Sequence, residues 1–304
     1  MSNFASLKKS SADIGRLTKE IEKINTPQGS DREEDNRFWK LERGKDGNGA
    51  AVIRFLPAPA VDGDDALPWV RYFDHGFKGP SGKWYIENSL TSIGQKDPVS
   101  EYNSSLWNAS SDENSWQRKQ ARDQKRRLHY IANILVIKDP SNPANEGQVK
   151  LFKFGKKIFD KITEAMNPQY PDDPTVNPFD LWTGANFKLR TRTVAGFPNY
   201  DQSAFEAPGA LSDDDSELEK IWKSEYSLKE FLETSKFKTY DELKKKLNEV
   251  LGEASEVGAP KASSKTIDTS DEDVPFKAAA QRKSVVAEDE DEDMKYFKGL
   301  AENE

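Results

Sequence analysis

Between residues 38 and about 205 the chain is divided into short apolar runs, and this division constrains the fold more than any other feature. The run at 51–56 ends at Pro57, and the run at 130–137 ends at a Lys-Asp-Pro sequence. Similar runs lie at 69–73, 83–87, 148–154 and 186–194. Short runs bounded by Gly, Pro, Asn and Asp are typical of strands in a small barrel or sandwich.

Two stretches have helical spacing instead. The first is predicted at 156–166, where four apolar side chains share one face: Ile158, Phe159, Ile162 and Met166. The second covers 210–252, where 227–230 and 239–242 both fit the capping box that satisfies free N–H groups at a helix start. Its last turns carry an apolar stripe and a terminating glycine: Leu243, Leu247, Val250, Leu251 and Gly252. The sequence therefore predicts an α+β protein that is mostly β.

The two ends of the chain differ from this core in composition. Residues 1–25 form a basic arm in which Ile14, Leu17, Ile21 and Ile24 fall on one helical face, and 26–37 form a polar linker. Residues 1–209 hold 30 Lys and Arg against 28 Asp and Glu, whereas residues 210–304 hold 15 against 25. From residue 253 there is too little apolar surface to offset chain entropy, so we expect a disordered acidic tail.

The sequence offers little support for catalysis. It has no cysteine, and its only two histidines, His75 and His129, have no metal-ligand spacing. It lacks a phosphate-binding glycine loop and a nucleophile elbow. A carboxylate metal site in a nucleic-acid-processing enzyme stays open as an alternative, as does an acidic scaffold that binds only proteins. With no long apolar run and no leader sequence, we expect a soluble intracellular protein.

Cations and aromatic side chains gather in the second half of the core. Residues 118–127 hold six Lys or Arg and one acid, with Trp107 and Trp116 before them and Tyr130 after. Lys188, Arg190 and Arg192 share one face of the run at 186–194. Single-strand binding needs this combination, because cations follow phosphates while aromatic faces stack on unpaired bases. The alternative is that the aromatic residues form the core and the cations are solvated.

Several longer phrases resemble one known family. They lie at 47–57, 82–87, 132–140, 154–162, 182–187 and 196–201, within a collinear likeness from about 38 to 250. They are similar to the single-stranded-DNA-binding, helix-destabilising proteins of T-even-type phages, the gene 32 family.

The resemblance implies a three-part plan. The arm, 1–25, would mediate cooperative self-association through a basic motif at Lys8, Lys9, Ser10 and Ser11. The core, 38–252, would be an OB-fold with an inserted subdomain at about 70–130. The tail, 253–304, would bind replication and recombination proteins such as a polymerase, a helicase loader and a recombinase. The expected function is sequence-non-specific coating of single-stranded DNA during phage replication, recombination and repair, in the cytoplasm of the infected host, without catalysis or a membrane.

The family's DNA-facing aromatic positions fall on Tyr102, Tyr130 and Tyr200, with Phe197 beside the last and Phe152 in place of a tyrosine. A second copy of the basic motif falls on Lys125, Arg126 and Arg127. With the clustered cations, the predicted DNA-binding set is Tyr102, Trp107, Trp116, Arg122, Lys125, Arg126, Arg127, Tyr130, Lys150, Phe152, Lys153, Lys188, Arg190, Arg192, Phe197 and Tyr200.

The family also binds zinc through one histidine and three cysteines. His75 matches the histidine, but Ser89 and residues 96–100 stand where the cysteines would be. A serine hydroxyl is a poor zinc ligand beside a thiolate, so we expect no zinc and no other cofactor. The alternative is an oxygen-rich site formed by Asp74, Asp97 and Glu101 with His75. Without metal, this subdomain would depend on packing, and the candidates are Trp69, Tyr72, Phe73, Phe77, Trp84 and Tyr85.

Overall fold

A computed structural model describes residues 35–170 and 172–252, and the fold begins at Phe38. The strands are β1 (Phe38–Trp39), β2 (Gly49–Phe55), β3 (Val70–Lys78), β4 (Trp84–Asn88), β5 (Arg127–Lys138), β6 (Val149–Phe154), β7 (Phe187–Val194), β8 (Phe197–Asn199) and β9 (Ala204–Phe205). The α-helices are α3 (Pro98–Asn108), α4 (Trp116–Asp123), α5 (Lys156–Met166), α6 (Asp215–Lys223) and α7 (Tyr240–Leu251). Single 3₁₀ turns are η1 (Ala60–Asp62), η2 (Leu90–Ile93), η3 (Pro143–Asn145), η4 (Lys229–Leu232) and η5 (Thr234–Lys236). The predicted mixed, mostly β architecture is confirmed.

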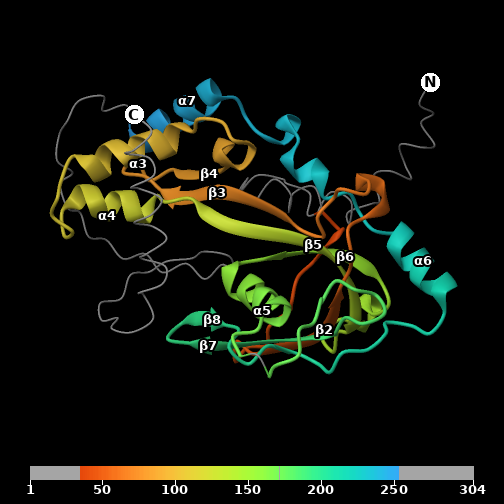
Figure 1. Cartoon of the computed structure of the whole chain (residues 1–304). Coiled ribbons are helices and arrows are strands. Elements are labelled where there is room, and N and C mark those ends of the chain that lie inside the picture. Colours follow the sequence, from red (N-terminus) through yellow and green to blue (C-terminus); the bar gives the residue numbers. More distant parts are fainter. Residues whose placement is uncertain (1–34, 171, 253–304) are drawn as a thin grey trace, which may run out of the picture. The chain divides into compact units, whose positions relative to one another are not determined.

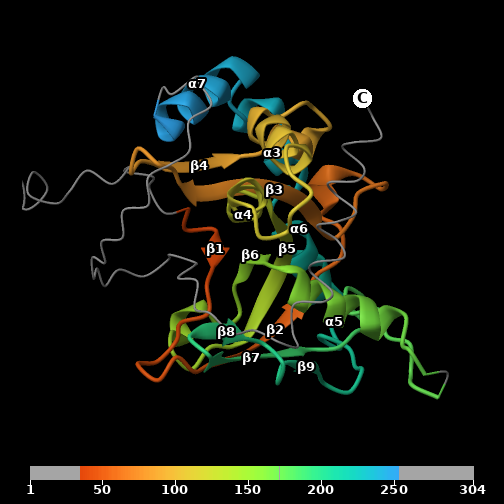
Figure 2. The ribbon, with the colours of Figure 1, turned by 90° about the vertical axis from the view of Figure 1, so that its left-hand side faces the viewer.

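Strand β5 connects the two halves of the fold. Its first residues pair with β3, its last residues pair with β2, and β6 runs along its other edge. The remaining sheet follows the order β1–β6–β5–β2–β7–β8, and only the short β1–β6 pair is parallel. Figures 1 and 2 show β3 and β4 on one side of β5, with β2, β7 and β8 on the other.

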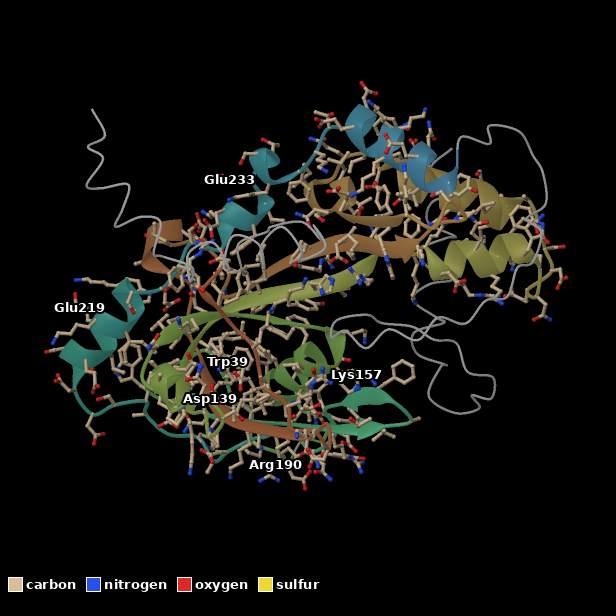
Figure 3. All side chains as sticks on the ribbon, turned by 180° about the vertical axis from the view of Figure 1, so that it is seen from behind. Trp39, Asp139, Lys157, Arg190, Glu219 and Glu233 are labelled. Carbon is tan, nitrogen blue, oxygen red and sulfur yellow. The ribbon has the colours of Figure 1, made fainter. Side chains whose placement is uncertain are left out.

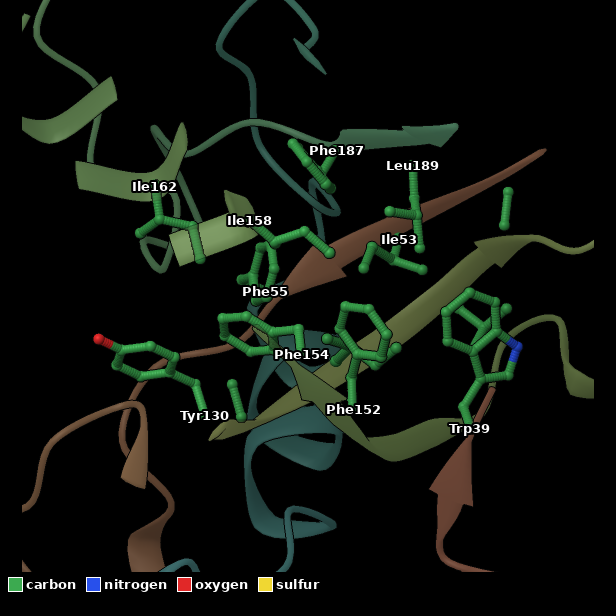
Figure 4. Packing of buried hydrophobic residues seen from close by; sticks show 14 of the residues in the cluster. Trp39, Ile53, Phe55, Tyr130, Phe152, Phe154, Ile158, Ile162, Phe187 and Leu189 are labelled. Carbon is green, nitrogen blue, oxygen red and sulfur yellow. The ribbon is translucent and has the colours of Figure 1, made fainter. Parts of the chain in front are cut away.

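The main core lies between these strands and α5. Ile53 and Phe55 of β2 face Phe187 of β7, because alternate residues of a strand point to the same face. Ile158 and Ile162 of α5 cover this cluster (Figure 4). Helix α5 begins and ends at the predicted residues, but Met166, in its last turn, is exposed rather than part of the apolar face.

A second core holds the segment between β3 and β5 together. Phe77, Tyr85 and Val99 pack against α7, whose buried residues are Leu243, Leu247 and Val250. Gly79, in the β3–β4 turn, lies so close to α7 that an added Cβ would meet the Val250 carbonyl oxygen at 2.2 Å. Helix α7 therefore completes the inserted segment, although it is about 150 residues away in sequence.

Helices α3 and α4 were not expected, because neither carries a long apolar stripe. The start of each helix is instead fixed by the residue that precedes it: Asp97 caps α3 by accepting from the Val99 and Ser100 N–H groups, and Ser115 caps α4. Side-chain caps of this kind satisfy N–H groups that have no partner within the helix.

The prediction that residues 210–252 are helical was partly wrong. Only α6 and α7 are α-helices there, and η4 and η5 lie between them. The capping box at Thr239 and Glu242 is confirmed, and Gly252 ends α7 in the left-handed conformation. Ser227 forms no capping box; its hydroxyl donates to Asp62, which also accepts from the Leu228 and Lys229 N–H groups. In the described part of the chain, no helix is both long and apolar enough to cross a membrane.

Candidate nucleic-acid interface

Helix α4 presents a row of cations that its packing holds in place. Ala121 is fully buried against Leu106 of α3, which fixes the orientation of the helix. Arg118 lies over the Trp107 ring, 4.4 Å from its centroid, and pairs with Glu113. Trp116, at the start of the helix, is 43% exposed. The helix therefore places an exposed indole and guanidinium groups on one short element.

The chain then enters β5 through Lys125, Arg126 and Arg127. The guanidinium carbon of Arg126 lies 3.9 Å from the ring centroid of Phe73 in β3, and that of Arg71 lies 5.6 Å away. Cations over an aromatic face are attracted by the negative potential of the ring. Phe73 is only partly buried, so a cation–aromatic pair remains at the surface of the β3–β5 ladder.

Asp74 organises the other face of the same ladder. Its carboxylate lies 2.7 Å from Arg127 Nε, 3.0 Å from His129 Nε2 and 3.8 Å from Lys153 Nζ. The Tyr72 ring packs on His129 at 5.3 Å between centroids, and Lys153 lies over Tyr72. One buried carboxylate thus meets three basic side chains, leaving the face rich in positive groups.

The environment shifts the pKa values of this cluster in a consistent way. Burial of Asp74 disfavours its charged form, but hydrogen bonds from His129 and Arg127 outweigh burial and hold its pKa below the usual range. Burial is also the main reason that the pKa of His129 is lowered, and nearby Lys153 adds to that effect. The arrangement favours an ionised Asp74 beside a neutral His129.

Two aromatic residues predicted to stack on bases lie in the core instead. Tyr130 is 6% exposed, with Phe159 stacked on it at 3.9 Å and Phe154 at 5.8 Å. Phe152 is 5% exposed and packs edge-on against Trp39 at 5.4 Å. Both point inward because strand alternation on β5 and β6 places them on the face against which α5 and the Trp39 side chain pack. Their ring faces are not available to bases in this structure.

The other predicted aromatic residues are partly exposed. Tyr102 packs between two apolar clusters, and its hydroxyl accepts from Gln120 at 3.4 Å. Tyr200 packs against the main core, and burial raises the pKa of its hydroxyl. Phe197 is half-buried on β8. None of these contacts tests a role in binding DNA, so that role stays a prediction.

The predicted cations do not gather on one face. Lys188, Arg190 and Arg192 lie on the exposed side of β7, as the alternation predicted, and Figure 3 labels Arg190 at the edge of the molecule away from β3 and α4. Lys188 pairs with Glu206 at 2.9 Å, and Arg192 pairs with Asp201. On β6, Lys150 is half-buried and points to the opposite face from Lys153. The structure thus brings together the cations of α4, β5 and Lys153, and separates them from those of β7.

The sequence predicts other roles, or none, for some residues near these cations. Tyr72 and Phe73 were expected only as packing for a metal-free subdomain, and Arg71 and His129 were not assigned to DNA binding. The register of β3 on β5, Tyr72 to His129 and Asp74 to Arg127, places Tyr72 and His129 beside Arg127 and Lys153 on one face, whereas Arg71 and Phe73 lie with Arg126 on the other face. The alternation of residues 69–73 signalled a strand, but only the pairing shows which cations it meets.

The residues at the expected zinc position form a closed hydrogen-bonded cluster. His75 is 1% exposed, with Nε2 at 3.3 Å from Asp97 and Nδ1 at 3.0 Å from the Gln124 carbonyl oxygen. Asp97 also accepts from the Ser89 hydroxyl and the Leu90 N–H group, both at 3.0 Å, besides capping α3. Burial opposes ionisation of Asp97, but contact with His75 and these donors lowers its pKa.

This donor set does not fit zinc. Both Asp97 oxygens already accept hydrogen bonds, and the remaining neighbours are serine hydroxyls. The alternative oxygen-rich site is wrong: Asp74 is held by Arg127, and Glu101 accepts from the Tyr240 hydroxyl. Within residues 35–170 and 172–252, no three His, Cys, Asp or Glu side chains are grouped to hold a metal ion.

Comparisons with known proteins show the family to which the chain is similar. Residues 47–251 match the family model described as "gp32 DNA binding protein like". The chain is 39% identical over 260 residues to the single-stranded DNA-binding protein of Enterobacteria phage T4, covering 83% of this chain and 82% of that protein. It is 38% identical, over the same lengths, to the protein of that name from Enterobacteria phage T2.

Proposed function

Because the chain belongs to the gp32-like family of DNA-binding proteins, we propose that it binds and coats single-stranded DNA without sequence preference. The observation that carries this proposal, beside family membership, is the surface formed by α4 and the β3–β5 ladder, named here the α4–β3 surface. Its residues are Trp116 and Arg122 of α4, Lys125 after it, Arg71, Phe73 and Arg126 on one face of the ladder, and Tyr72, Arg127, His129 and Lys153 on the other face. The family is defined by binding rather than by a reaction, so the function is not enzymatic.

Chemistry on the α4–β3 surface suits a flexible polyanion. Guanidinium and ammonium groups neutralise phosphates and release counterions, which supplies affinity that does not depend on sequence. The exposed indole of Trp116 offers a face on which any base can stack, whereas Arg126 already lies over the Phe73 ring. No contact of this kind reads base edges, which agrees with non-specific coating.

We further assign the sheet around the main core to an OB-fold. Antiparallel pairing of β2, β5, β6 and β7 around inward-facing apolar side chains supports the assignment. The segment from β3 to α4 is then an inserted subdomain, and the His75–Asp97 cluster supports the proposal that it folds without zinc.

The roles of the chain ends complete the proposal. Residues 1–25, with Lys8, Lys9, Ser10 and Ser11, would give cooperative binding of neighbouring protomers, and 253–304 would recruit replication and recombination proteins. Both segments lie outside the described residues. As a phage protein of replication, recombination and repair, the molecule would act inside the infected host.

Titration of the full chain with poly(dT) at several salt concentrations tests the central proposal. We expect quenching of tryptophan fluorescence and an association constant that falls steeply with salt. Lys125→Ala should reduce the salt slope by about 1, and Trp116→Ala should weaken binding by about 1–3 kcal/mol. Lys245→Ala removes a cation from α7 and should change neither quantity. Arg190→Ala shows whether DNA also follows the outer face of β7.

The same titration separates the rivals. A protein-only scaffold would show neither quenching nor a salt slope. An enzyme with a carboxylate metal site would degrade or modify the oligonucleotide when a divalent metal is added, and the intact poly(dT) recovered after incubation with Mg²⁺ would exclude it.

A further inference from the structure

A second exposed surface lies at α6 and η1, apart from the α4–β3 surface. Three large apolar side chains are exposed there: Val61 on η1 by 69%, Trp182 by 57% and Trp222 by 36%. Helix α6 packs beside η1, as Figures 1 and 3 show. Exposed apolar groups that cluster in this way mark interaction surfaces more often than isolated ones do.

Both indoles are held in place at their polar edges. Trp182 Nε1 donates to Asp215 Oδ1 at 3.0 Å, and Trp222 Nε1 donates to the Ala58 carbonyl oxygen at 2.9 Å. Asp215 and Trp222 are seven residues apart on α6, so they lie two turns apart on one side of the helix. Beneath them, Leu218 is buried and Ile221 packs against the same cluster. Rings that are already ordered lose little conformational entropy when a partner binds.

The charge around these rings excludes nucleic acid as the partner. Helix α6 and the residues before it present exposed carboxylates at Asp213, Asp214, Asp215, Glu217 and Glu219. Two more, Asp64 and Asp65, follow η1. The cations beside these carboxylates are Lys220 and Lys223 of α6, of which Lys223 pairs with Glu219, and Lys229 of η4, which donates to the Asp62 carbonyl oxygen. A polyanion is repelled here, whereas a basic segment with an apolar face is attracted.

We propose that this α6–η1 surface receives the N-terminal arm, residues 1–25, of a neighbouring copy. The arm holds five Lys or Arg against three Asp or Glu, and its spacing places Ile14, Leu17, Ile21 and Ile24 on one face. Its composition therefore complements the surface in both charge and apolar character. The inference rests on the proposed cooperative binding and names the receiving surface for it.

The chain is long enough for this exchange. The fold begins at Phe38, whose ring packs against Phe231 of η4 at 5.7 Å. The 12 residues of the linker, 26–37, can span up to about 40 Å when extended. An arm attached in this way can reach a protomer bound next along the DNA, and linking by a short tether raises the effective concentration of the contact.

The first experiment compares binding to poly(dT) with binding to an oligonucleotide of about eight nucleotides, which holds one protomer. In the full chain, Trp182→Ala and Asp213→Lys should each weaken poly(dT) binding by about 10-fold or more, because cooperativity is lost. Affinity for the short oligonucleotide should stay unchanged. The matched controls, Trp84→Ala on β4 and Glu249→Lys on α7, alter an exposed tryptophan and an exposed carboxylate elsewhere and should leave both affinities unchanged.

The second experiment uses the absence of cysteine from the chain. One preparation carries Val61→Cys and a second carries Ala12→Cys, and the two are mixed on poly(dT) with a short bis-maleimide. We expect a crosslinked heterodimer, and none when Glu249→Cys replaces Val61→Cys. Because the two cysteines are on separate chains, this product can only report contact between copies.

The outcomes are distinct. Unchanged cooperativity in both surface variants, or equal crosslinking of Val61→Cys and Glu249→Cys, overturns the inference while leaving DNA binding intact. A third preparation carries both Val61→Cys and Ala12→Cys on one chain. If crosslinks form only within that chain and never between copies, the arm folds onto its own core and the inference is overturned. Failure of the unaltered protein to bind poly(dT) contradicts the proposed function itself.

Discussion

At the scale of single residues, Asp74 shows how a buried carboxylate organises a basic surface. Its side chain holds Arg127, His129 and Lys153 within 4 Å on one face of the β3–β5 ladder. Since the charges of Arg127 and Lys153 would otherwise repel each other, the negative charge of Asp74 allows these two side chains to lie together. It is 8% exposed, so its contacts are screened little by solvent.

We expect Asp74→Asn to lower the free energy of unfolding by about 1.5–3 kcal/mol at pH 7, the usual value for hydrogen bonds to a charged group. The folded state lowers the pKa of Asp74, so its contribution is present above the unfolded pKa near ~3.9 and is lost as the pH falls below it. Urea unfolding at pH 7, 5 and 3.5 measures the difference. If the stability difference between the unaltered protein and Asp74→Asn grows toward low pH, Asp74 does not stabilise the fold as an ionised carboxylate. Asp160→Asn, in an exposed pair with Lys156, should change stability by less than about 0.5 kcal/mol.

Asp97 has the role in the inserted segment that Asp74 has in the β3–β5 ladder, because its one carboxylate joins β3, η2 and α3. Asp97→Asn should lower the free energy of unfolding by about 2–3 kcal/mol, since buried donors lose an ionised acceptor. In the unaltered protein, neither EDTA nor added Zn²⁺ should shift the melting temperature. A stabilising shift with Zn²⁺, absent from His75→Gln, would show that the segment binds the metal after all.

At the scale of elements, the turn from α6 to η4 is fixed by a carboxylate from a distant loop. Asp62 of η1 accepts from Ser227 Oγ at 2.5 Å and from the Leu228 and Lys229 N–H groups at 2.7 and 3.1 Å. It does for η4 what a local capping residue does for a helix. Glu225 lies nearby, 7% exposed, and neither of its carboxyl oxygens has a partner among the described residues.

Burial, reinforced by the charge of Asp62, raises the pKa of Glu225 to about 9. The folded protein therefore binds a proton that the unfolded chain releases near pH ~4.3, and stability falls as the pH rises between these values. Glu225→Gln should remove this pH dependence of stability. The difference in free energy of unfolding between Glu225→Gln and the unaltered protein should therefore grow, in favour of the variant, from pH 5 to pH 9. Chemical unfolding across this range measures it. A constant difference would show that Glu225 is ionised in the fold.

At the scale of the whole molecule, two surfaces of opposite charge lie on one core. The α4–β3 surface is basic and aromatic, whereas the α6–η1 surface is acidic and apolar. This separation suits the two proposed roles, DNA binding at the basic surface and protein binding at the acidic one. The acidic tail, with 12 Asp or Glu and 6 Lys or Arg over residues 265–304, would compete with DNA for the basic face.

Deleting residues 253–304 should therefore tighten binding to poly(dT) at low salt, with an effect that shrinks as salt screens the tail. Binding isotherms at several salt concentrations provide the measurement. Equal affinity of the two proteins at low salt would rule out competition by the tail.

Deleting residues 1–25 should abolish cooperativity and leave binding to a short oligonucleotide largely intact. The ratio of the two affinities is the measurement, and cooperative binding without the arm would refute its role in self-association. Loss of short-oligonucleotide binding would instead place the arm at the DNA.

Local patterns predicted much of the fold. Helix α5, the strands near their observed bounds, the box at Thr239 and the stop at Gly252 all depend on residues close in sequence. The predictions that failed depend on contacts between residues far apart in sequence. Ser227 donates to Asp62, and the N-cap of α3, Asp97, also contacts His75. Neither contact leaves a local signal.

By itself, the sequence determined the mixed, mostly β architecture and the kind of chemistry, because strand period, turn residues and composition are local properties. The family followed from the collinear likeness of its longer phrases to known proteins. Only the tertiary structure decided which aromatic rings are exposed. Tyr130 and Phe152 are buried because α5 and the Trp39 side chain pack on their face of the sheet. The pairing of β3 with β5 places Tyr72 and Phe73 beside cations on opposite faces of the ladder. Whether a ring on a strand packs in the core or faces solvent depends on what covers that face, and the covering elements come from far along the chain.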